Sequence, residues 1–430
     1  MSEFDAIVVG GGPAGTSAAM RLAANKLNVL LVEKADPPGS KNVSGGVLWG
    51  NSLAGVMPDW EKTAPLERYV KSKGVGFLTK DSSIDINFRS SKFSETKTGY
   101  TVLRTKLDQF LNKKAKDAGA TVVTGVTVDK LAFEGKKVIG VEQDGDIITS
   151  DAVILAEGAN PRVAIDSGIR PPLKDQDVAI GVKEVIKLPE KTINERFNLR
   201  EKEGFAGEYV LGFLEGGVEA GGFLYTNKDS ISLGVVVSMK HLRENNQTHS
   251  YDIIEQFKEH PSIAPLLDEG KVDEYSAHMV QEGGLESIPK LYGNGYMITG
   301  DAAGFSFSNG LVLQGMNYAI ASGIAAADTL VEAKSGSGIS EQAFSKYEEK
   351  LLNSFVLRDM HTFKGIEELT WGSLIHQKMP SILEKVMLGV LMEDGEPKKH
   401  MSQIVKEALK ESGLKSSKLL LEGYKMYRRM

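Results

Sequence analysis

Residues 1–34, MSEFDAIVVGGGPAGTSAAMRLAANKLNVLLVEK, decide the fold of this chain. Residues 6–9 are a short apolar run with β-branched side chains, which predicts a buried strand. Residues 13–24 carry helix-forming side chains, and residues 27–32 are a second apolar run that predicts another strand. A strand, a glycine-rich turn, a helix and a strand in this order predict the β-α-β unit that opens a Rossmann-like domain.

The turn of this unit has the spacing G-x-G-x-x-G, formed by Gly10, Gly12 and Gly15. These glycines permit a tight turn, close approach of the backbone to a pyrophosphate, and close packing of the helix on the strand. Glu33 follows at the separation expected for a carboxylate that hydrogen-bonds a ribose. We therefore expect a bound dinucleotide, NAD or FAD, rather than a flexible loop. The expected contacts in this unit are Gly10, Gly12, Pro13, Ala14, Gly15, Glu33 and Lys34.

The length and charge of the chain limit its class. A chain of 430 residues holds two or three domains of the usual size. Its formal net charge of −6 provides no basic surface for nucleic acid, so we expect no nucleic-acid partner. No signal peptide precedes the first strand, and no uncharged apolar run reaches the roughly 18 residues of a spanning helix. We expect the protein in the cytoplasm or on a membrane surface.

The chain contains no cysteine. It therefore cannot form a redox-active disulfide, use a cysteine nucleophile or ligate an iron–sulfur cluster through thiolates of its own. Its seven histidines lack the paired spacing of a metal site, so we expect no metal. The chemistry must come from a bound cofactor or from other side chains. We expect the cofactor to be the redox centre, and we assign no catalytic side chain.

Two segments that follow the first unit are expected to return to the cofactor. Residues 35–51 are a loop rich in Gly, Pro, Ser and Asn at the carboxyl edge of the sheet. Arg104 begins an amphipathic helix expected over residues 102–118, and its guanidinium suits a pyrophosphate. A plain surface loop and a solvated arginine are the alternatives. The expected contacts are Ser44, Gly45, Gly46 and Arg104.

Later strands of the nucleotide domain end in small residues that let the backbone pass close to a cofactor. One strand is expected over residues 121–128 and another, after a hairpin at 136–150, over residues 152–155. The expected contacts at these strands are Val126, Ala156 and Gly158.

Residues 295–304, GYMITGDAAG, close the nucleotide domain. Gly300 and Asp301 follow a strand, where the aspartate can accept hydrogen bonds from a ribityl or ribose hydroxyl. The long part of the Ala- and Gly-rich residues 308–329 predicts a closely packed helix whose N-terminus could face a flavin pyrimidine, with a purely structural helix as the alternative. These features favour FAD over NAD. The expected contacts are Gly300, Asp301, Gly310, Leu311 and Val312.

A second, largely antiparallel domain is expected between residues 166 and 289, to which a hairpin at 76–88 adds strands. Its unusual segment is GFAGEYVLGFLEGGVEAGGFLY, residues 204–225. This segment is either ordinary core strand or an apolar patch that enters lipid or admits a hydrophobic substrate. The residues expected to form a quinone and membrane surface are Phe205, Tyr209, Leu211, Phe213, Leu214, Phe223 and Tyr225.

The fold class is thus α/β, with a Rossmann-like FAD domain, an inserted and largely antiparallel β domain for a substrate, and a C-terminal helical region. We place the FAD domain at residues 1–70, 95–165 and 290–335, the second domain at 71–94 and 166–289, and the helical region at 336–430. The last residues, 413–430, form a basic amphipathic tail that could lie on anionic lipid, dock an acidic partner, or be a solvated helix.

Several motifs together resemble the flavoprotein superfamily of para-hydroxybenzoate hydroxylase and geranylgeranyl reductase. They are the first turn ending in Glu33, LRTKLD at 103–108, VILAEGA at 153–159 and GDAAG at 300–304. Within this superfamily, KNVSGGVLWGNSL at 41–53 and FSNGLVLQGMNYAIASGIAAAD at 307–328 closely resemble the electron transfer flavoprotein:quinone oxidoreductases, particularly their FixC-type subunits. The resemblance extends from residue 4 to about residue 383.

This resemblance implies non-covalent FAD, electrons accepted from a two-subunit electron transfer flavoprotein, and a membrane quinone as acceptor. It places the chain at the cytoplasmic face of a membrane, as a peripheral or monotopic protein. Long eukaryotic relatives ligate a cluster through cysteines, which this chain lacks. FixC-type proteins instead pair with a small ferredoxin-like iron–sulfur subunit, and we expect such a partner here.

Two alternatives remain open at this point. One is a geranylgeranyl-reductase-like enzyme that saturates isoprenoid double bonds. Those reductases usually carry a Y-x-W-x-F-P signature, whereas the corresponding GGFLYTNKDSISLG at 221–234 has neither the Trp nor the Pro. The other is a FAD-bearing docking subunit whose catalysis resides in its partners.

Overall fold

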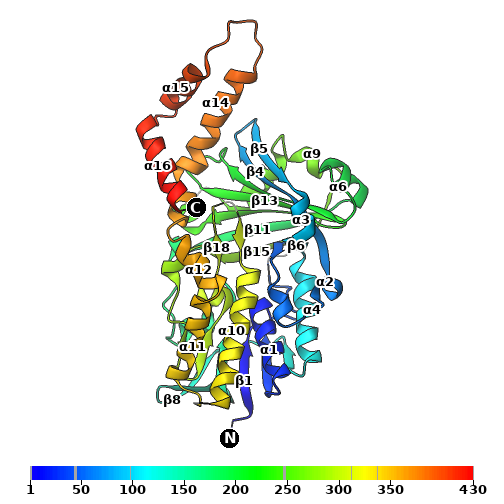
Figure 1. Cartoon of the computed structure of the whole chain (residues 1–430), viewed down its shortest axis with the longest axis vertical. Coiled ribbons are helices and arrows are strands. Elements are labelled where there is room, and N and C mark those ends of the chain that lie inside the picture. The colour runs from blue at the N-terminus through cyan, green and yellow to red at the C-terminus, as the bar shows by residue number, and fades with distance from the viewer. Residues whose placement is uncertain are drawn as a thin grey trace.

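The computed structural model of this chain describes residues 2–42, 46–96, 98–245, 248–310, 312–336 and 338–429. The predicted contacts Ser44, Gly45 and Leu311 lie outside the described residues. Figure 1 shows the nucleotide domain at one end of an elongated molecule, a large sheet across its middle, and a helical extension at the other end.

The first sheet carries the predicted β-α-β unit. Its strands follow the order β16-β17-β10-β1-β2-β7, with β1 parallel to both β2 and β10. Parallel strands buried by helices on their faces require apolar runs, which explains the composition of residues 6–9. The strands of this sheet and of its β8–β9 extension are β1 Phe4–Val9, β2 Val29–Glu33, β7 Thr121–Thr124, β8 Lys130–Glu134, β9 Lys137–Gln143, β10 Asp146–Leu155, β16 Tyr292–Gly293 and β17 Tyr296–Ile298.

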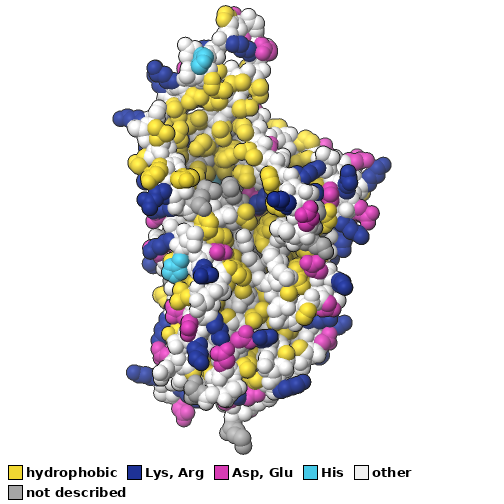
Figure 2. All heavy atoms as spheres, in the orientation of Figure 1, with side chains coloured by type: hydrophobic (Ala, Val, Ile, Leu, Met, Phe, Trp, Pro, Cys, Tyr) yellow, Lys and Arg dark blue, Asp and Glu magenta, His cyan; other side chains and the backbone are white. Residues whose placement is uncertain are grey.

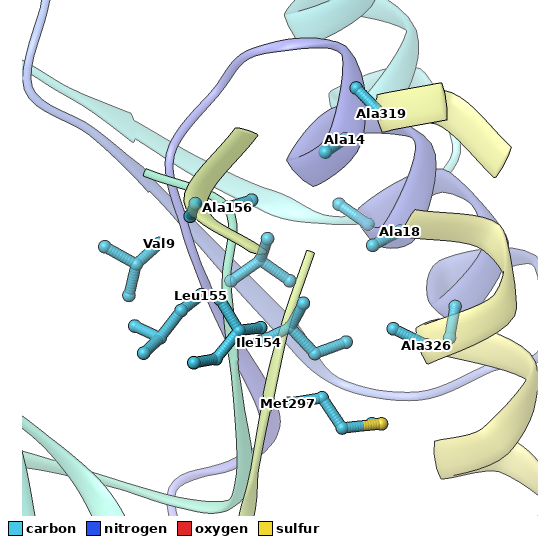
Figure 3. Packing of buried hydrophobic residues seen from close by; sticks show 14 of the residues in the cluster. Val9, Ala14, Ala18, Ile154, Leu155, Ala156, Met297, Ala319 and Ala326 are labelled. Atoms are coloured by element: carbon cyan, nitrogen blue, oxygen red, sulfur yellow. The ribbon is translucent and has the colours of Figure 1, made fainter. Parts of the chain in front are cut away.

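Helices α1 and α10 pack against each other beneath this sheet through small side chains. Figure 3 shows Ala14 and Ala18 of α1 facing Ala319 and Ala326 of α10. A Cβ atom added to Gly323 of α10 would lie only 2.2 Å from the carbonyl oxygen of Ala14. The Ala- and Gly-rich composition of α10 therefore allows its backbone to lie close to the backbone of α1.

The second sheet has nine strands in the order β15-β11-β14-β13-β12-β4-β6-β3, with β5 paired to β4. β3 and β6 belong to this sheet, although their residues fall within the ranges expected for the FAD domain. Their pairing joins segments about fifty residues apart, which no local pattern reveals. The strands are β3 Gly46–Trp49, β4 Leu66–Leu78, β5 Ser83–Arg89, β6 Gly99–Val102, β11 Val178–Lys187, β12 Glu203–Leu211, β13 Ala220–Thr226, β14 Ser230–Ser238 and β15 Lys271–Gln281. A separate two-stranded sheet is formed by β18 Phe307–Ser308 and β19 Leu313–Gln314.

Several predicted elements differ from the observed ones. The hairpin strand and the buried strand expected near residue 150 are one continuous strand, β10. The strand expected at 121–128 ends at Thr124. The helix expected in the long part of residues 308–329 begins at Met316 and continues to Ser335.

The helices cover the sheets and form the C-terminal extension, in which α14 and α15 pack side by side around Ile382, Ala408 and Leu409 (Figure 1). The α-helices are α1 Pro13–Ala24, α2 Trp60–Thr63, α3 Ser91–Thr96, α4 Arg104–Asp117, α5 Arg162–Asp166, α6 Glu190–Arg196, α7 Met239–Glu244, α8 Ser250–Glu259, α9 Ala264–Leu267, α10 Met316–Ser335, α11 Glu341–Leu352, α12 Phe355–Thr362, α13 Glu367–Thr370, α14 Met379–Leu391, α15 Met401–Glu411 and α16 Ser416–Arg429. Short 3-10 turns span Ser52–Gly55, Asp175–Asp177, Gly284–Ser287 and Gly300–Ala303, and a π-helical turn spans Leu374–Lys378.

Hydrogen bonds connect the helical extension to the rest of the molecule. Thr79, just after β4, donates a hydrogen bond of 2.5 Å to Glu384 of α14. Arg429, at the end of α16, donates to the carbonyl of Gly365 at 2.6 Å and to Glu368 at 3.0 Å. Within the described part of the chain, every helix is too short or too polar to traverse a bilayer.

Candidate cofactor site

The first turn is shaped for close approach of a ligand to the backbone. Gly10 has φ +109°, and a Cβ atom there would lie 2.2 Å from the carbonyl oxygen of Ala156. Gly12 is the N-cap of α1 and provides no side-chain cap, so the first N–H groups of this helix remain free for an anion. Glu33 accepts hydrogen bonds from the N–H groups of Gly11 at 2.6 Å and Ala35 at 2.7 Å. This carboxylate is thereby held at the rim of the turn.

A cavity opens beside this turn, between the nucleotide domain and the second sheet. The nucleotide domain contributes the first turn, the loop after β10, the Gly300 turn and the start of α10. The second sheet contributes one face of β11, β13, β14 and β15. The predicted contacts that line the cavity are Gly10, Gly12, Pro13, Ala14, Glu33, Lys34, Gly46, Arg104, Ala156, Gly158, Gly300 and Asp301.

Arg104 supplies positive charge next to the first turn. Its guanidinium donates to Asp108, one turn along α4, at 2.8 and 2.9 Å. A Cβ atom at Gly12 would lie 3.7 Å from Nη2 of Arg104, so the cation stands against the position where a pyrophosphate would approach. Burial would lower the pKa of Arg104, but the charge and hydrogen bonds of Asp108 outweigh burial and hold it above its ordinary value.

Asp301 and the start of α10 form the opposite wall. Burial raises the pKa of Asp301, and the positive charges of Arg104 and His278 oppose the increase. The N-cap of α10 is Gly315, which offers no side-chain cap and lines the cavity. Two uncapped helix N-termini, a fixed arginine and a buried aspartate are the groups that a diphosphate and a polyhydroxyl chain require. The residues present therefore fit FAD.

An aromatic pair forms part of the cavity wall contributed by the second sheet. The rings of Phe223 and Tyr225 stack with centroids 5.1 Å apart, and both residues line the cavity. The Tyr225 hydroxyl donates to Glu208 at 3.3 Å, and Lys73 donates to the same carboxylate at 2.7 and 2.8 Å. Burial raises the pKa of Glu208, although Lys73 and Tyr225 favour its charged form. Lys73 also lies over the ring of Trp49, 5.1 Å from its centroid.

Four predicted contacts within the described residues lie outside the cavity wall. Gly15 packs under the turn, where a Cβ atom would lie 1.9 Å from the carbonyl oxygen of Gly10. The N–H of Val126 donates to the carbonyl of Glu33 at 3.2 Å. Gly310 lies next to Thr370 and Ile366, and Val312 donates its N–H to Asn309. Gly310 and Val312 belong to the connection between β18 and β19.

The membrane surface predicted within residues 204–225 is wrong. Phe205, Tyr209 and Leu211 are buried in the core of the second sheet. Their side chains face α6 and α8, where Phe205 contacts Phe197 and Tyr209 contacts Phe257. Phe213 and Leu214 are partly buried against the same core. Of the predicted set, Phe223 and Tyr225 line the cofactor cavity instead.

Sequence reasoning missed other residues of the cavity wall. Neighbours of the predicted contacts, such as Ala35 and Glu157, could have been found from the same loops. Residues of the second sheet could not, because only the docking of that sheet onto the nucleotide domain brings them to the cofactor. The missed residues are Ala35, Lys41, Asn42, Val47, Glu157, Ala159, Gly181, Val236, His278, Met279, Val280, Thr299, Ser306, Leu313, Gln314, Gly315, Met316 and Ala319.

A second cavity, of about 800 Å³, lies beside the start of β11 and the 3-10 turn Gly284–Ser287. The C-terminal helices form its other side. Trp371 stacks on His376 with centroids 5.2 Å apart, and its Nε1 lies 3.5 Å from Glu282. Burial raises the pKa of Glu282 to about 7. Arg429 lines this cavity from the end of α16.

Two family models match consecutive parts of the chain. The model for pyridine nucleotide-disulphide oxidoreductases matches residues 4–171, and the model described as ETF-QO, ubiquinone-binding, matches residues 178–280. The first match concerns the nucleotide-binding half, since a chain without cysteine cannot perform the disulfide chemistry of that description. The second match covers strands β11–β15, which include the sheet wall of the cofactor cavity.

Comparison with known proteins gives relatives of nearly full length. The probable electron transfer flavoprotein-quinone oxidoreductase YdiS of Escherichia coli K12 is 41% identical over 98% of this chain and 98% of its own length. Protein FixC of the same strain is 40% identical over 89% of this chain and 87% of its own. A solved structure of a geranylgeranyl bacteriochlorophyll reductase-like protein from Thermoplasma acidophilum superimposes with a TM-score of 0.71, at 21% identity, over 98% of this chain and 99% of that one. The last likeness shows a shared fold.

Proposed function

Because the chain belongs to the electron transfer flavoprotein-quinone oxidoreductase family, we propose that it accepts electrons from a two-subunit electron transfer flavoprotein and passes them through FAD to a quinone. The protein is a FAD-dependent flavoprotein oxidoreductase. One observation carries the quinone assignment: the region matched by the ubiquinone-binding model forms the wall that closes the FAD cavity. An acceptor bound there would lie beside the cofactor.

Within this cavity, the proposed acceptor position is next to Phe223 and Tyr225. A planar quinone ring packs well on a stacked aromatic pair. Its reduction to a hydroquinone consumes protons as well as electrons, and Tyr225 is hydrogen-bonded to a carboxyl group whose pKa burial raises. We assign proton delivery at the acceptor to Tyr225 and Glu208, with Lys73 holding the carboxylate in place.

The direct test is quinone reduction by the FAD-loaded chain together with its donor flavoprotein. We expect reduction of a short-chain quinone, and we expect Tyr225→Phe to lower kcat about 10-fold to 100-fold while FAD binding is unchanged. Tyr209→Phe is the matched control, because Tyr209 faces α8 rather than the cavity. A complex that reduces no quinone would exclude the proposal. Saturation of an isoprenoid double bond instead would favour the reductase alternative.

The proposed membrane contact is an apolar surface on the helical extension. Figure 2 shows a broad hydrophobic area over this extension, at the end of the molecule opposite the nucleotide domain. Quinones with long tails reside in lipid, so an enzyme that reduces them gains from a surface that rests on the bilayer. We place this contact on the cytoplasmic face. The apolar surface consists of Met387, Leu388, Val390, Leu391, Met392, Met401, Leu420, Leu421, Tyr424 and Tyr427.

A ferredoxin-like iron–sulfur subunit is the remaining proposed partner. The chain has no thiolate with which to ligate a cluster. We therefore propose that the cluster is carried by a separate small subunit, as the FixC-type resemblance implies. Purification of the chain from native membranes should bring down a two-subunit flavoprotein and a small iron–sulfur protein. Recovery of the chain without an iron–sulfur protein, under conditions that retain the flavoprotein, would contradict this part of the proposal.

A further inference from the structure

A buried lysine beside the cofactor cavity has no hydrogen-bond partner among the residues that the structure describes. Lys183 in β11 is 0% exposed, and its Nζ has no hydrogen-bond partner within the described residues. A buried ammonium without a counter-charge is strongly unfavourable, so buried lysines are normally paired or neutral. Lys183 is therefore a group whose partner is expected from outside the protein chain.

The strand register places Lys183 on the face of the second sheet that closes the cavity. Gly181, two residues earlier and thus on the same face, lines the cavity. In β15, the partner of Gly181 is His278 and the partner of Lys183 is Ser276. His278 also lines the cavity. The side chains of Lys183 and Ser276 consequently share the sheet face that adjoins the cofactor.

Ser276 adds a second unsatisfied group at this position. Its Oγ is buried and, like Nζ of Lys183, has no partner among the residues that the structure describes. Directly paired residues of antiparallel strands lie side by side on one face. One cationic donor and one hydroxyl thus stand together without partners.

The charges that face Lys183 leave it without a counter-ion. Burial lowers the pKa of Lys183 to about 7; the negative charge of Glu274 in β15 opposes this effect, and the positive charge of Arg104 in α4 adds to it. Glu184, the next residue of β11, points to the other face and pairs with Lys258 at 3.0 Å. In the described part of the chain, no carboxylate lies within ion-pair distance of Lys183.

We propose that Lys183, with Ser276 beside it, binds an anionic group of FAD and that the cofactor is the counter-charge of this buried ammonium. FAD offers negative charge at its diphosphate in every oxidation state and on its ring after reduction. The proposal rests on the FAD site alone. Its failure would leave the donor and the quinone of the proposed function untouched, and the reverse also holds.

The test compares Lys183→Met with Lys187→Met, which makes the same change at an exposed lysine of the same strand. The affinity of each apoprotein for oxidised FAD is measured by flavin fluorescence at about pH 6, where Lys183 is charged in the free protein. The midpoint potential of the bound flavin is measured in parallel. If the diphosphate is the partner, K183M should bind oxidised FAD about tenfold or more weakly.

If the reduced ring is the partner, K183M should bind oxidised FAD normally but lose about tenfold in its preference for the reduced form. This loss corresponds to a fall of about 30 mV in the two-electron midpoint potential. Either result supports the proposal and identifies the anionic group. A K183M protein that matches K187M in both affinity and potential would overturn it, since Lys183 would then be a merely structural residue.

Proton uptake gives a second readout that needs no catalytic activity. Binding requires Lys183 to be charged, so the affinity of the wild-type protein for FAD should fall as the pH rises above about 7. The measurement uses the oxidation state of FAD, oxidised or reduced, whose binding K183M weakens in the first test. The K183M protein should lack this dependence. If K183M does not fold, Lys183→Gln replaces it, and the pH dependence of the wild-type protein still tests the proposal. A constant wild-type affinity between about pH 6 and about pH 9 would argue against it.

Discussion

At the residue scale, ionisation of the buried carboxyl group of Glu282 should be detectable in the fluorescence of a neighbouring tryptophan. Its pKa of about 7 lies above the ordinary value because of burial, and its carboxyl lies 3.5 Å from the indole nitrogen of Trp371. We expect the fluorescence of Trp371 to change with a midpoint near pH 7, as a negative charge forms beside the indole. Glu282→Gln should abolish the transition. Glu286→Gln is the control, because this second acid of the same cavity is 77% exposed and pairs with Lys364.

The same group gives a stability effect of defined sign. A carboxyl whose pKa is raised by folding stabilises the folded state fully below its unfolded pKa, and this contribution is lost as the pH rises through about 7. At pH values above 7, Glu282→Gln should therefore be more stable than the wild-type protein, by an amount on the order of 1 kcal/mol. Urea unfolding at two pH values measures the difference. Greater stability of the wild-type protein at high pH would contradict the assigned direction.

At the residue scale, the role of a residue can be predicted from sequence when it depends only on neighbouring residues of the chain. The roles of Gly10 and Gly12 follow from the spacing of one turn, so they were predictable. Lys183 and Glu282 were not, because charged side chains are mostly exposed to solvent. Their burial results from the docking of the nucleotide domain and of the C-terminal helices around the start of β11 and the end of β15.

At the scale of elements, the close contact between α1 and α10 requires a residue without a side chain at Gly323. Gly323→Ala would place a Cβ atom against the carbonyl of Ala14, and we expect a loss of stability of about 1–3 kcal/mol with weakened FAD retention. Gly423→Ala is the matched control in another helix. Its Cβ atom would meet no neighbour within 4 Å, so helix propensity should make this variant slightly more stable. Equal effects in urea unfolding would disprove the packing argument.

Elements whose causes are local were predicted best. Helix α1 occupies the predicted residues 13–24 because a proline starts it and a run of small and apolar residues maintains it. In contrast, β10 crosses the polar pair Ser150 and Asp151, which read as the end of a hairpin. The strand continues because its first half pairs with β9 and its second half pairs with β1. The local sequence pattern does not predict this change of partner strand.

At the scale of the whole molecule, variants of the apolar surface should change membrane binding without changing cofactor binding. The double variant Leu391→Asp with Leu420→Asp alters side chains that are 65% and 74% exposed and remote from the FAD cavity. We expect at least a tenfold loss of sedimentation with anionic vesicles, with normal FAD content. Reduction of a quinone embedded in vesicles should fall, and reduction of a water-soluble analogue should not.

The control for this variant is Ile147→Asp, which introduces the same charge at a residue 52% exposed on β10 of the nucleotide domain. It should bind vesicles like the wild-type protein. Equal vesicle binding by the double variant and the control would remove the helical extension from the membrane contact.

The general architecture was predictable, and the exposed apolar surface was predictable in part, because α16 lies within the basic amphipathic tail expected at residues 413–430. Alternating aromatic residues and glycines at 204–225 resemble an exposed sheet face, but α6 and α8 cover that face. The exposed apolar residues lie on or next to three helices, α14, α15 and α16, which are separate in the sequence. Only the assembly of these helices in space forms the broad hydrophobic area seen in Figure 2.

The two ends of the molecule in Figure 1 have a practical consequence. The start of β1 lies at the extremity of the nucleotide domain, and the hairpin of α14 and α15 forms the other extremity. A protein attached to an electrode or a sensor chip through its N-terminus would therefore stand with the helical hairpin facing outward. A layer prepared in this way would turn the proposed membrane surface away from the support and keep the nucleotide domain next to it.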